Sequence, residues 1–130
     1  PYPMRDPQMP SYLKIYADDE GETHFADVPV ELQTTNFAPP AAPLDVSTAH
    51  EAKRFVFVGF KSGWVGDWHP SPVRQFAFIL AGTFEVGVSD GEVRTLAAGA
   101  VVFLQDTTGK GHSTRITSPE DGLAAMCQLD

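Results

Sequence analysis

Short runs of apolar residues, separated by glycine, proline and acidic turn residues, dominate the chain from residue 53 onward. The run from Arg54 to Phe60 (RFVFVGF) is β-branched and aromatic and has no helical period. Thr83 to Val88 alternates apolar and polar residues, and Asp90-Gly91 predicts a hairpin turn before a return strand from Glu92 to Leu96. The pattern therefore predicts strands and no amphipathic helix of useful length.

The same pattern predicts the remaining elements of the chain. Further strands are expected at 12–16, 23–25, 28–37, 75–81, 101–105, 112–117 and 123–129. Gly63 to Asp67 is interpreted as a turn, and Leu44 to Glu51 is ambiguous, with one helical turn after Ser47 as an alternative. About nine or ten short strands at these spacings are typical of an all-β sandwich or barrel.

One stretch, from Trp68 to Gly82, combines polar groups with a strand (WHPSPVRQFAFILAG). If the stretch is extended, positions separated by an even number of residues share one face. That face would carry His69, Ser71, Gln75, Ala77, Ile79 and Ala81. Arg74 would lie on the opposite face, where a surface or interface ion pair is expected. The stretch therefore predicts a site at one end of a strand.

The N-terminal part of the chain carries weaker signals. Residues 1–10 are expected to be a tag-derived or loose arm, and residues 11–130 a single domain with its barrel core at about 53–129. The segment from Ala38 to Pro43 (APPAAP) excludes helix and central strand. It is interpreted as an ordered extended loop or arm, with a plain linker as the alternative.

Composition narrows the class of partner. The net charge of −8, from 17 acidic and 9 basic residues, argues against nucleic acid and against anionic membranes, which both attract clustered cations. No apolar run is long enough to span a bilayer, and no signal-like segment opens the chain. The single cysteine, Cys127, excludes an internal disulfide framework and is expected to be a buried, inert thiol. These features together favour a cytoplasmic location.

Two groups of residues resemble the motifs of the small single-domain cupins (the RmlC-like superfamily), especially uncharacterised bacterial members. The first motif in that family is His-x-His, then Glu, then Gly; the second is Gly, a short strand, and Pro-x-Gly-x-x-His. The matching positions here are His69, Ser71, Gln75 and Gly82, followed by Gly99, Thr107, Gly109 and His112. The resemblance implies an all-β double-stranded β-helix, or jelly-roll barrel, with an extended N-terminal arm. It also implies a homodimer.

In metal-binding cupins the histidines and the glutamate hold one divalent metal ion. Here Ser71 and Gln75 replace two of those four ligands, so the resemblance implies a weakened site held by His69 and His112 with Gln75 assisting. Fe, Zn, Ni or Mn would be the occupant, and no organic cofactor is expected. Asp67 and His24 are weaker candidate ligands, and for His24 a surface or structural role is favoured over ligation.

Three functions remain open at this point. The first is an enzyme that uses the metal on a small oxygenated or aromatic molecule, as an oxygenase, isomerase or lyase. The second is a metal-free isomerase, cyclase or lyase with His69 or His112 as general acid or base and Gln75 orienting the substrate. The third is a non-catalytic small-ligand-binding or structural barrel. Residues expected along the substrate pocket are Ser71, Ala77, Trp68 and Lys110.

Overall fold

The structure, a computed structural model, describes residues 10–130 and is built from strands and loops, with no helix in that range. The predicted tag-derived or loose arm at residues 1–10 lies almost entirely outside the described residues. The strands are β1 (Ser11–Ala17), β2 (Thr23–Pro29), β3 (Gln33–Thr35), β4 (Leu44–Val46), β5 (Arg54–Phe60), β6 (Val65–His69), β7 (Gln75–Ala81), β8 (Phe84–Val88), β9 (Val93–Leu96), β10 (Val101–Leu104), β11 (His112–Ile116) and β12 (Gly122–Gln128). The all-β prediction is confirmed.

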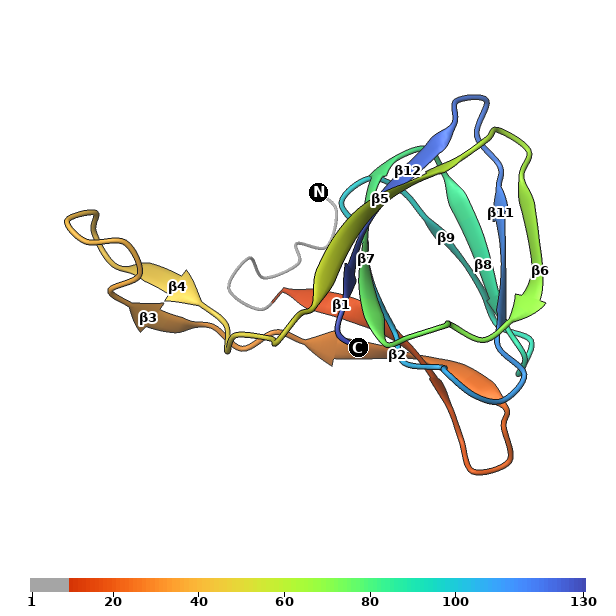
Figure 1. Ribbon diagram of the computed structural model, residues 1–130, viewed down its shortest axis with the longest axis horizontal. Helices are drawn as coiled ribbons and strands as arrows, with labels where there is room; N and C mark the ends of the chain where they lie inside the picture. The colour runs from red at the N-terminus through yellow and green to blue at the C-terminus, as the bar shows by residue number, and fades with distance from the viewer. Residues whose placement is uncertain (1–9) are drawn as a thin grey trace, which may run out of the picture.

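Two sheets face one another and enclose the core (Figure 1). One sheet has the strand order β2-β1-β10-β7-β12-β5, and the other has the order β6-β11-β8-β9. From β5 to β12 the chain passes repeatedly from one sheet to the other, which is the connectivity of a jelly roll. The predicted jelly-roll barrel is therefore the observed architecture.

The hairpin of β1 and β2 extends the larger sheet beyond β10. β1 pairs with β10 in parallel, with Leu13 opposite Val102 and Ile15 opposite Leu104, whereas the other pairings in the two large sheets are antiparallel. Because side chains alternate along a strand, this register sends Leu13 and Ile15 into the barrel. Both are buried, and Ile15 is fully so.

The core consists of the inward-facing residues of both sheets. They are Leu13, Ile15, Phe25, Ala77, Ile79, Phe84, Val86, Val88, Val102, Leu104, Ile116 and Ala124. On β7 Gln75, Ala77 and Ile79 are buried and Phe78 and Leu80 are exposed, as alternation predicts. Phe76 is buried as well, because the rings of Tyr12, His50 and Phe103 pack against it. Arg74, which precedes that strand, pairs with Asp130 at 2.8 Å, so the predicted ion pair is confirmed.

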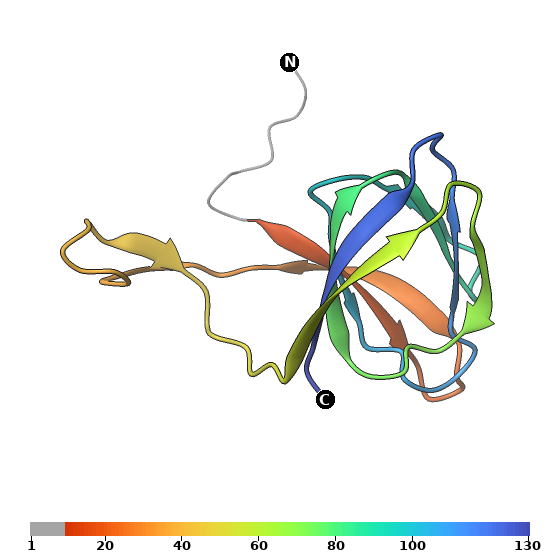
Figure 2. The ribbon, with the colours of Figure 1, turned by 45° about the horizontal axis from the view of Figure 1, so that its top comes forward.

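A hairpin of β3 and β4 projects from the barrel (Figures 1 and 2). Its two strands pair only with each other, and the proline-rich segment 38–43 lies in the loop that joins them. The range 28–37 does hold a strand, β3, but it is shorter than the range, because β2 ends at Pro29 and β3 begins at Gln33. The alternative of a helical turn after Ser47 was wrong, since β4 ends at Val46 and coil follows.

The turn predicted from Gly63 to Asp67 is present at Gly63 but is shorter than predicted, because β6 begins at Val65. Gly66 misled the interpretation, since glycine usually weakens a strand. Here the indole ring of Trp64 folds over Gly66 and occupies the space where a side chain would lie. The aromatic ring therefore takes the place of the missing side chain, and the strand persists.

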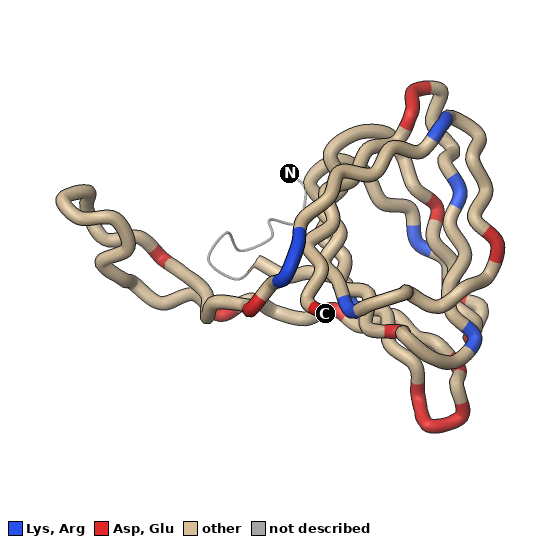
Figure 3. Tube along the Cα trace, in the orientation of Figure 1, with Lys and Arg blue, Asp and Glu red and all other residues tan. Residues whose placement is uncertain are grey.

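Charged residues gather in the loops and on the smaller sheet (Figure 3). By contrast, β7 and β12 carry no charged residue, and β5 carries only Arg54 at its start. In residues 10–130 no helix is long and apolar enough to cross a membrane. Cys127 on β12 is a free thiol and is half-buried rather than buried as predicted.

Candidate functional site

A cavity of about 120 Å³ lies inside the barrel, between the two sheets. Its wall is mostly apolar and includes Ile15, Phe60, Trp64, Pro72, Ala77, Ile79, Phe84, Val86, Leu96, Val102, Leu104, Ala124 and Met126. The polar residues on it are His69, Ser71, Gln75, His112 and Thr114. Cavities of roughly 150 Å³ hold a molecule the size of benzene, so this space suits a small ligand.

His69 and His112 face each other across two neighbouring strands. His69 ends β6 and His112 begins β11, and the register of the antiparallel pair places them directly opposite one another. Their ring centroids lie 5.0 Å apart. His112 is buried, whereas His69 is exposed, so His69 stands where the cavity opens to solvent.

Asp106 holds the ring of His112. Its Oδ2 lies 2.7 Å from Nδ1 of His112, and the carboxyl group is completely buried. A carboxylate accepts hydrogen bonds, so Nδ1 of His112 carries the proton and Nε2 is left with its lone pair. The other carboxyl oxygen, Oδ1, is buried and has no hydrogen-bond partner within the described residues.

His69 is fixed in the same tautomer by a different acceptor. Its Nδ1 lies 2.6 Å from the backbone carbonyl oxygen of Asp67 and donates to it. The backbone carbonyl can only accept, so Nε2 of His69 is the nitrogen without the proton. The cavity therefore has two imidazoles on its wall, each with Nε2 as its basic nitrogen.

The loop before β11 brings His112 close to the end of β6. Gly111 has a φ of +77°, and a Cβ atom there would overlap the backbone carbonyl of His69 and the nitrogen of Pro70. Glycine is needed for both reasons. The Thr23 hydroxyl donates to the Gly111 carbonyl at 2.7 Å and ties this loop to β2.

Gln75 and Ser71 belong to a chain of hydrogen bonds. Nε2 of Gln128 donates to Oε1 of Gln75 at 3.0 Å, and Nε2 of Gln75 donates to the Ser71 hydroxyl at 3.1 Å. That hydroxyl donates in turn to the carbonyl of Val73 at 2.6 Å. Ser71 and Gln75 are both buried, so the network satisfies polar groups on the cavity wall.

The structure brings together most of the predicted site, although not on one strand. His69, Ser71, Gln75 and Ala77 all line the cavity. His69 lies in the smaller sheet and Gln75 in the larger, because the loop over Pro70 to Arg74 carries the chain between sheets. The shared face therefore results from a corner between facing sheets, and the condition that the whole stretch is extended is not met.

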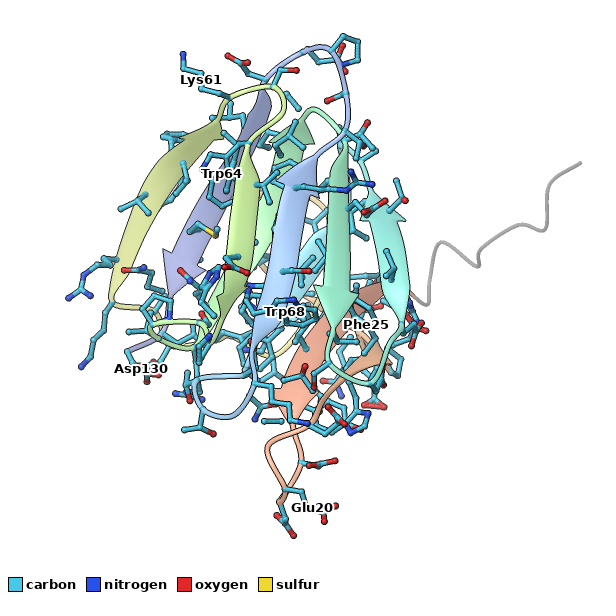
Figure 4. All side chains as sticks on the ribbon, turned by 90° about the vertical axis from the view of Figure 1, so that its right-hand side faces the viewer. Glu20, Phe25, Lys61, Trp64, Trp68 and Asp130 are labelled. Carbon is cyan, nitrogen blue, oxygen red and sulfur yellow. The ribbon has the colours of Figure 1, made fainter. Side chains whose placement is uncertain are left out.

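Four predicted residues lie away from the cavity wall. Trp68 is exposed and precedes His69 on β6, so alternation points it outward (Figure 4), and the exposed Asp67 donates no side chain to the cavity. The amine of Lys110 lies 3.3 Å from a carboxyl oxygen of Glu22 instead.

His24 is engaged on the outside of the barrel. Its two ring nitrogens each lie 2.8 Å from a carboxyl oxygen, one of Asp18 and one of Asp90. Hydrogen bonds to Asp18, and then to Asp90, raise the pKa of His24 above its ordinary value. The favoured structural role of His24 agrees with this arrangement.

Three residues of the site were missed by the sequence interpretation. Trp64 and Phe60 form an edge-to-face pair with centroids 5.2 Å apart, and both line the cavity. Asp106 had only one signal in the sequence, a carboxylate in the loop DTTGKG that leads to His112. The contact between Asp106 and His112 could be inferred only by knowing that this loop folds back onto the imidazole ring of His112.

The donor set is incomplete for a metal ion. Structural and catalytic sites for Zn or Fe use at least three strong protein ligands. Among residues 10–130 no group of three or more His, Cys, Asp or Glu side chains is placed to hold one ion. Gln75 already accepts a hydrogen bond through its carbonyl oxygen, so two imidazoles remain. These residues do not fit a full metal site.

Comparisons with known proteins found similar solved structures. No family model matches the chain, and no curated protein matches it. The structures include an RmlC-like cupin from Shewanella frigidimarina (20% identity, 95% of each chain, TM-score 0.47) and the Cnp3 cupin domain of Schizosaccharomyces pombe (12% identity, 95% of this chain and 85% of that one, TM-score 0.48). The conserved SPY1581 protein of unknown function from Streptococcus pyogenes has 17% identity over 65% of this chain and 69% of its own, with a TM-score of 0.44. Solved cupins are thus among the matches.

Proposed function

We propose that the protein binds a small, largely apolar molecule that carries a carbonyl or hydroxyl group, and that Nε2 of His112 exchanges a proton with it. The observation that carries the proposal is the buried 2.7 Å contact between Asp106 and Nδ1 of His112. A carboxylate behind an imidazole fixes the tautomer and stabilises the imidazolium that forms when Nε2 takes a proton. His112 is then a general base of an isomerase or lyase.

The wall of the cavity supports the substrate class. Phe60, Trp64 and Ile79 are apolar, whereas the polar residues on the wall are the two histidines with Ser71, Gln75 and Thr114. A ligand with an apolar body and one oxygen-bearing group matches that division. Removal of a proton from the carbon beside a carbonyl leaves the electron pair shared with the carbonyl oxygen, and return of the proton completes the exchange.

His69 has a second role in this proposal. It is exposed where the cavity opens, and its ring lies 5.0 Å from that of His112. An imidazole at that position can exchange protons with water and pass one to the substrate oxygen. The buried His112 would therefore act as the base, and the exposed His69 would exchange protons with solvent.

The proposal is tested by isotope exchange. Cyclohexanone, acetophenone and phenylpyruvate would be incubated with the protein in D₂O, and loss of the proton beside the carbonyl would be followed by NMR. We expect exchange above that of free imidazole, loss of the excess in His112→Ala, and partial loss in Asp106→Asn. Val65→Ser, on the exposed side of β6, is the matched control. Exchange no faster in the wild type than in His112→Ala would rule out the base for these probes.

A metal-assisted enzyme is the second candidate, because metal-ligating histidines also donate their other ring nitrogen to a carboxylate. His69 and His112 would be the ligands, and Gln75 would have to exchange its hydrogen bonds to assist. Elemental analysis of protein purified without a histidine tag separates the two. Near-stoichiometric Fe, Zn, Ni or Mn that is lost in His112→Ala supports this candidate.

The same purified protein can be used to test whether it only binds a ligand and does not catalyse a reaction. Trp64 lines the cavity, so its fluorescence should respond to acetophenone entering it. Saturable quenching with no isotope exchange and no metal would identify a ligand-binding barrel.

A further inference from the structure

The outward surface of the larger sheet carries an uncovered apolar area, here named the outer aromatic face. Its members are Phe55 and Phe57 on β5, Phe78 and Leu80 on β7, and Leu123 on β12. Phe55, Phe57 and Phe78 are 59%, 67% and 40% exposed. The pairing register places Phe57 opposite Ala125 and Ala125 opposite Phe78, so these side chains form one continuous surface.

This face is unlike the rest of the molecule. The chain has a net charge of −8, yet β7 and β12 have no charged residue and β5 has only Arg54 at its start. Single exposed apolar side chains are ordinary, but three exposed phenylalanines on β5 and β7, on either side of β12, are not. A surface of this kind is expected to be covered in the working protein.

The projecting hairpin of β3 and β4, here named the hairpin arm, also exposes apolar side chains and has no surface packed against it. Its residues are exposed except for Val46, which is half-buried. Phe37 and Leu44 are 64% and 49% exposed. A two-stranded hairpin with nothing packed against it is marginal in water, so the arm is expected to need a surface to lie on.

The arm and the face lie on the same side of the barrel. Figures 1 and 2 show the arm leaving the barrel on the side of β5 and extending away from it. The segment that returns from the arm passes over the sheet at His50, whose ring packs edge-to-face on Phe76 with centroids 5.2 Å apart. The root of the arm is thus held beside its own outer aromatic face, while its tip reaches beyond the molecule.

The arm also matches the face in charge. From Leu32 to Leu44 the sequence LQTTNFAPPAAPL contains no charged residue. Figure 3 shows one acidic position within the arm, Asp45 on β4, and further charged positions at its base. The uncharged part of the arm, which bears Phe37, can cover an uncharged face without burying an unpaired charge, provided that Asp45 stays in solvent.

We propose that two copies of this chain form a symmetric dimer in which each hairpin arm lies on the outer aromatic face of the other copy. Phe37 and Leu44 of one protomer pack against Phe55, Phe57 and Phe78 of its partner. The contact is the same in both directions, as a two-fold axis requires. This inference is independent of the proposed function, because the outer aromatic face and the cavity lie on opposite sides of the larger sheet.

The exposed phenylalanines supply more than half of the surface that such a dimer needs. With roughly 200 Å² for each phenylalanine side chain, the exposed parts of the four phenylalanines supply about 450 Å² per protomer. A stable interface needs about 800 Å² per partner. Leu44, Leu80, Leu123 and the prolines of the arm would supply much of the remainder.

Sedimentation equilibrium of the full chain tests the proposal with three single variants. Phe37→Ser truncates the arm, Phe57→Ser truncates the face, and Val65→Ser is the control, since Val65 is 70% exposed on the other sheet. We expect a wild-type dimer that persists in high salt and dimers weakened at least about tenfold in Phe37→Ser and Phe57→Ser. Val65→Ser should match the wild type. Far-ultraviolet circular dichroism checks that each variant is folded.

Mixing the two weakened variants tests which surfaces meet. A mixed pair keeps one intact contact, between the arm of the Phe57→Ser chain and the face of the Phe37→Ser chain. Its dissociation constant should fall between those of the wild type and of the single variants. A monomeric wild type overturns the proposal. So does a Phe37→Ser chain that associates as the wild type does, or a mixture no tighter than its components.

Discussion

Oδ2 of Asp106 lies 2.7 Å from Nδ1 of His112, and the Asp106 side chain is fully shielded from solvent. The pair joins the loop after β10 to the first residue of β11. A buried imidazole N–H without an acceptor costs free energy, so this contact contributes to the stability of the barrel as well as to the orientation of the ring.

Asp106→Ala should therefore destabilise the protein by about 1–3 kcal/mol, because Nδ1 of His112 would be left buried without an acceptor. Asp106→Asn should cost less, since its amide oxygen can still accept. Urea unfolding measures both, and the ¹⁵N shifts of the His112 ring report the tautomer. Asp19→Asn, on an exposed loop, is the control. Losses no larger than that of the control in both variants would contradict the role of the pair.

Gln75→Glu should increase the affinity for divalent metal ions. The substitution would add a third strong donor to the wall that already carries His69 and His112. Equilibrium dialysis against Zn²⁺ or Ni²⁺ would show tighter binding than in the wild type, with the increase lost in the Gln75→Glu, His112→Ala double variant. Equal affinity in Gln75→Glu and wild type would mean that the neutral amide is not what limits the site.

Gly111→Ala should be strongly destabilising and should separate the two histidines. A Cβ atom would overlap the backbone of His69, and the φ of +77° is unfavourable for alanine. Gly91→Ala is the matched control, because Gly91 also has a positive φ (+102°) but no atom within 4 Å of its added Cβ. The melting temperature should fall further for Gly111→Ala by several degrees, which corresponds to about 1 kcal/mol or more. Equal shifts would show that only backbone conformation matters.

The bridge from His24 to Asp18 and Asp90 should make stability depend on pH. The folded pKa of His24 is raised, chiefly by its hydrogen bond to Asp18, so its contribution is fully present below the unfolded value of 6.5 and is lost as pH rises through the folded pKa. The pKa values of both aspartates are lowered, for Asp90 mainly by the backbone N–H of Glu92, so their contributions are present above 3.8 and are lost as pH falls.

His24→Gln should consequently lower the free energy of unfolding most between about pH 4 and 6.5, and least at alkaline pH. Urea unfolding at a series of pH values gives the difference curve against the wild type. Glu20→Gln, an exposed change in the same loop, is the control. A difference that grows as the pH rises above 7 would contradict the sign of the linkage.

Much of the barrel could be predicted because the alternation of buried and exposed positions can be recognised within the sequence of each single strand. Gln75 to Ala81 was predicted with its limits and with the faces of its residues, since one side of a half-buried strand must be apolar. β6 could not be predicted in this way, because the glycine at its second position is compensated by the side chain of Trp64. That compensation depends on a three-dimensional contact and leaves no periodic signal.

The site residues also differ in whether the sequence alone could identify them. His69 and His112 could be identified by motif resemblance, but their direct opposition depends on the register of β6 against β11, which no single strand encodes. Asp106 was missed because its contact depends on the path of a loop. Trp68 was placed in the pocket because it adjoins His69 in the sequence, whereas alternation along β6 turns its side chain outward, where it is 50% exposed.

The parallel pairing of β1 with β10 has a consequence for how the barrel assembles. β1 is among the first segments of the chain, yet its partner is formed almost a whole domain later, and closing so long a loop is slow. Ile15 forms part of the cavity wall, so we expect that wall to stay open until the late strands are in place. Pulse-labelled hydrogen exchange during refolding should then show amides of β1 gaining protection after those of β7 and β12. The ligand space would be completed last, by one of the earliest segments of the chain.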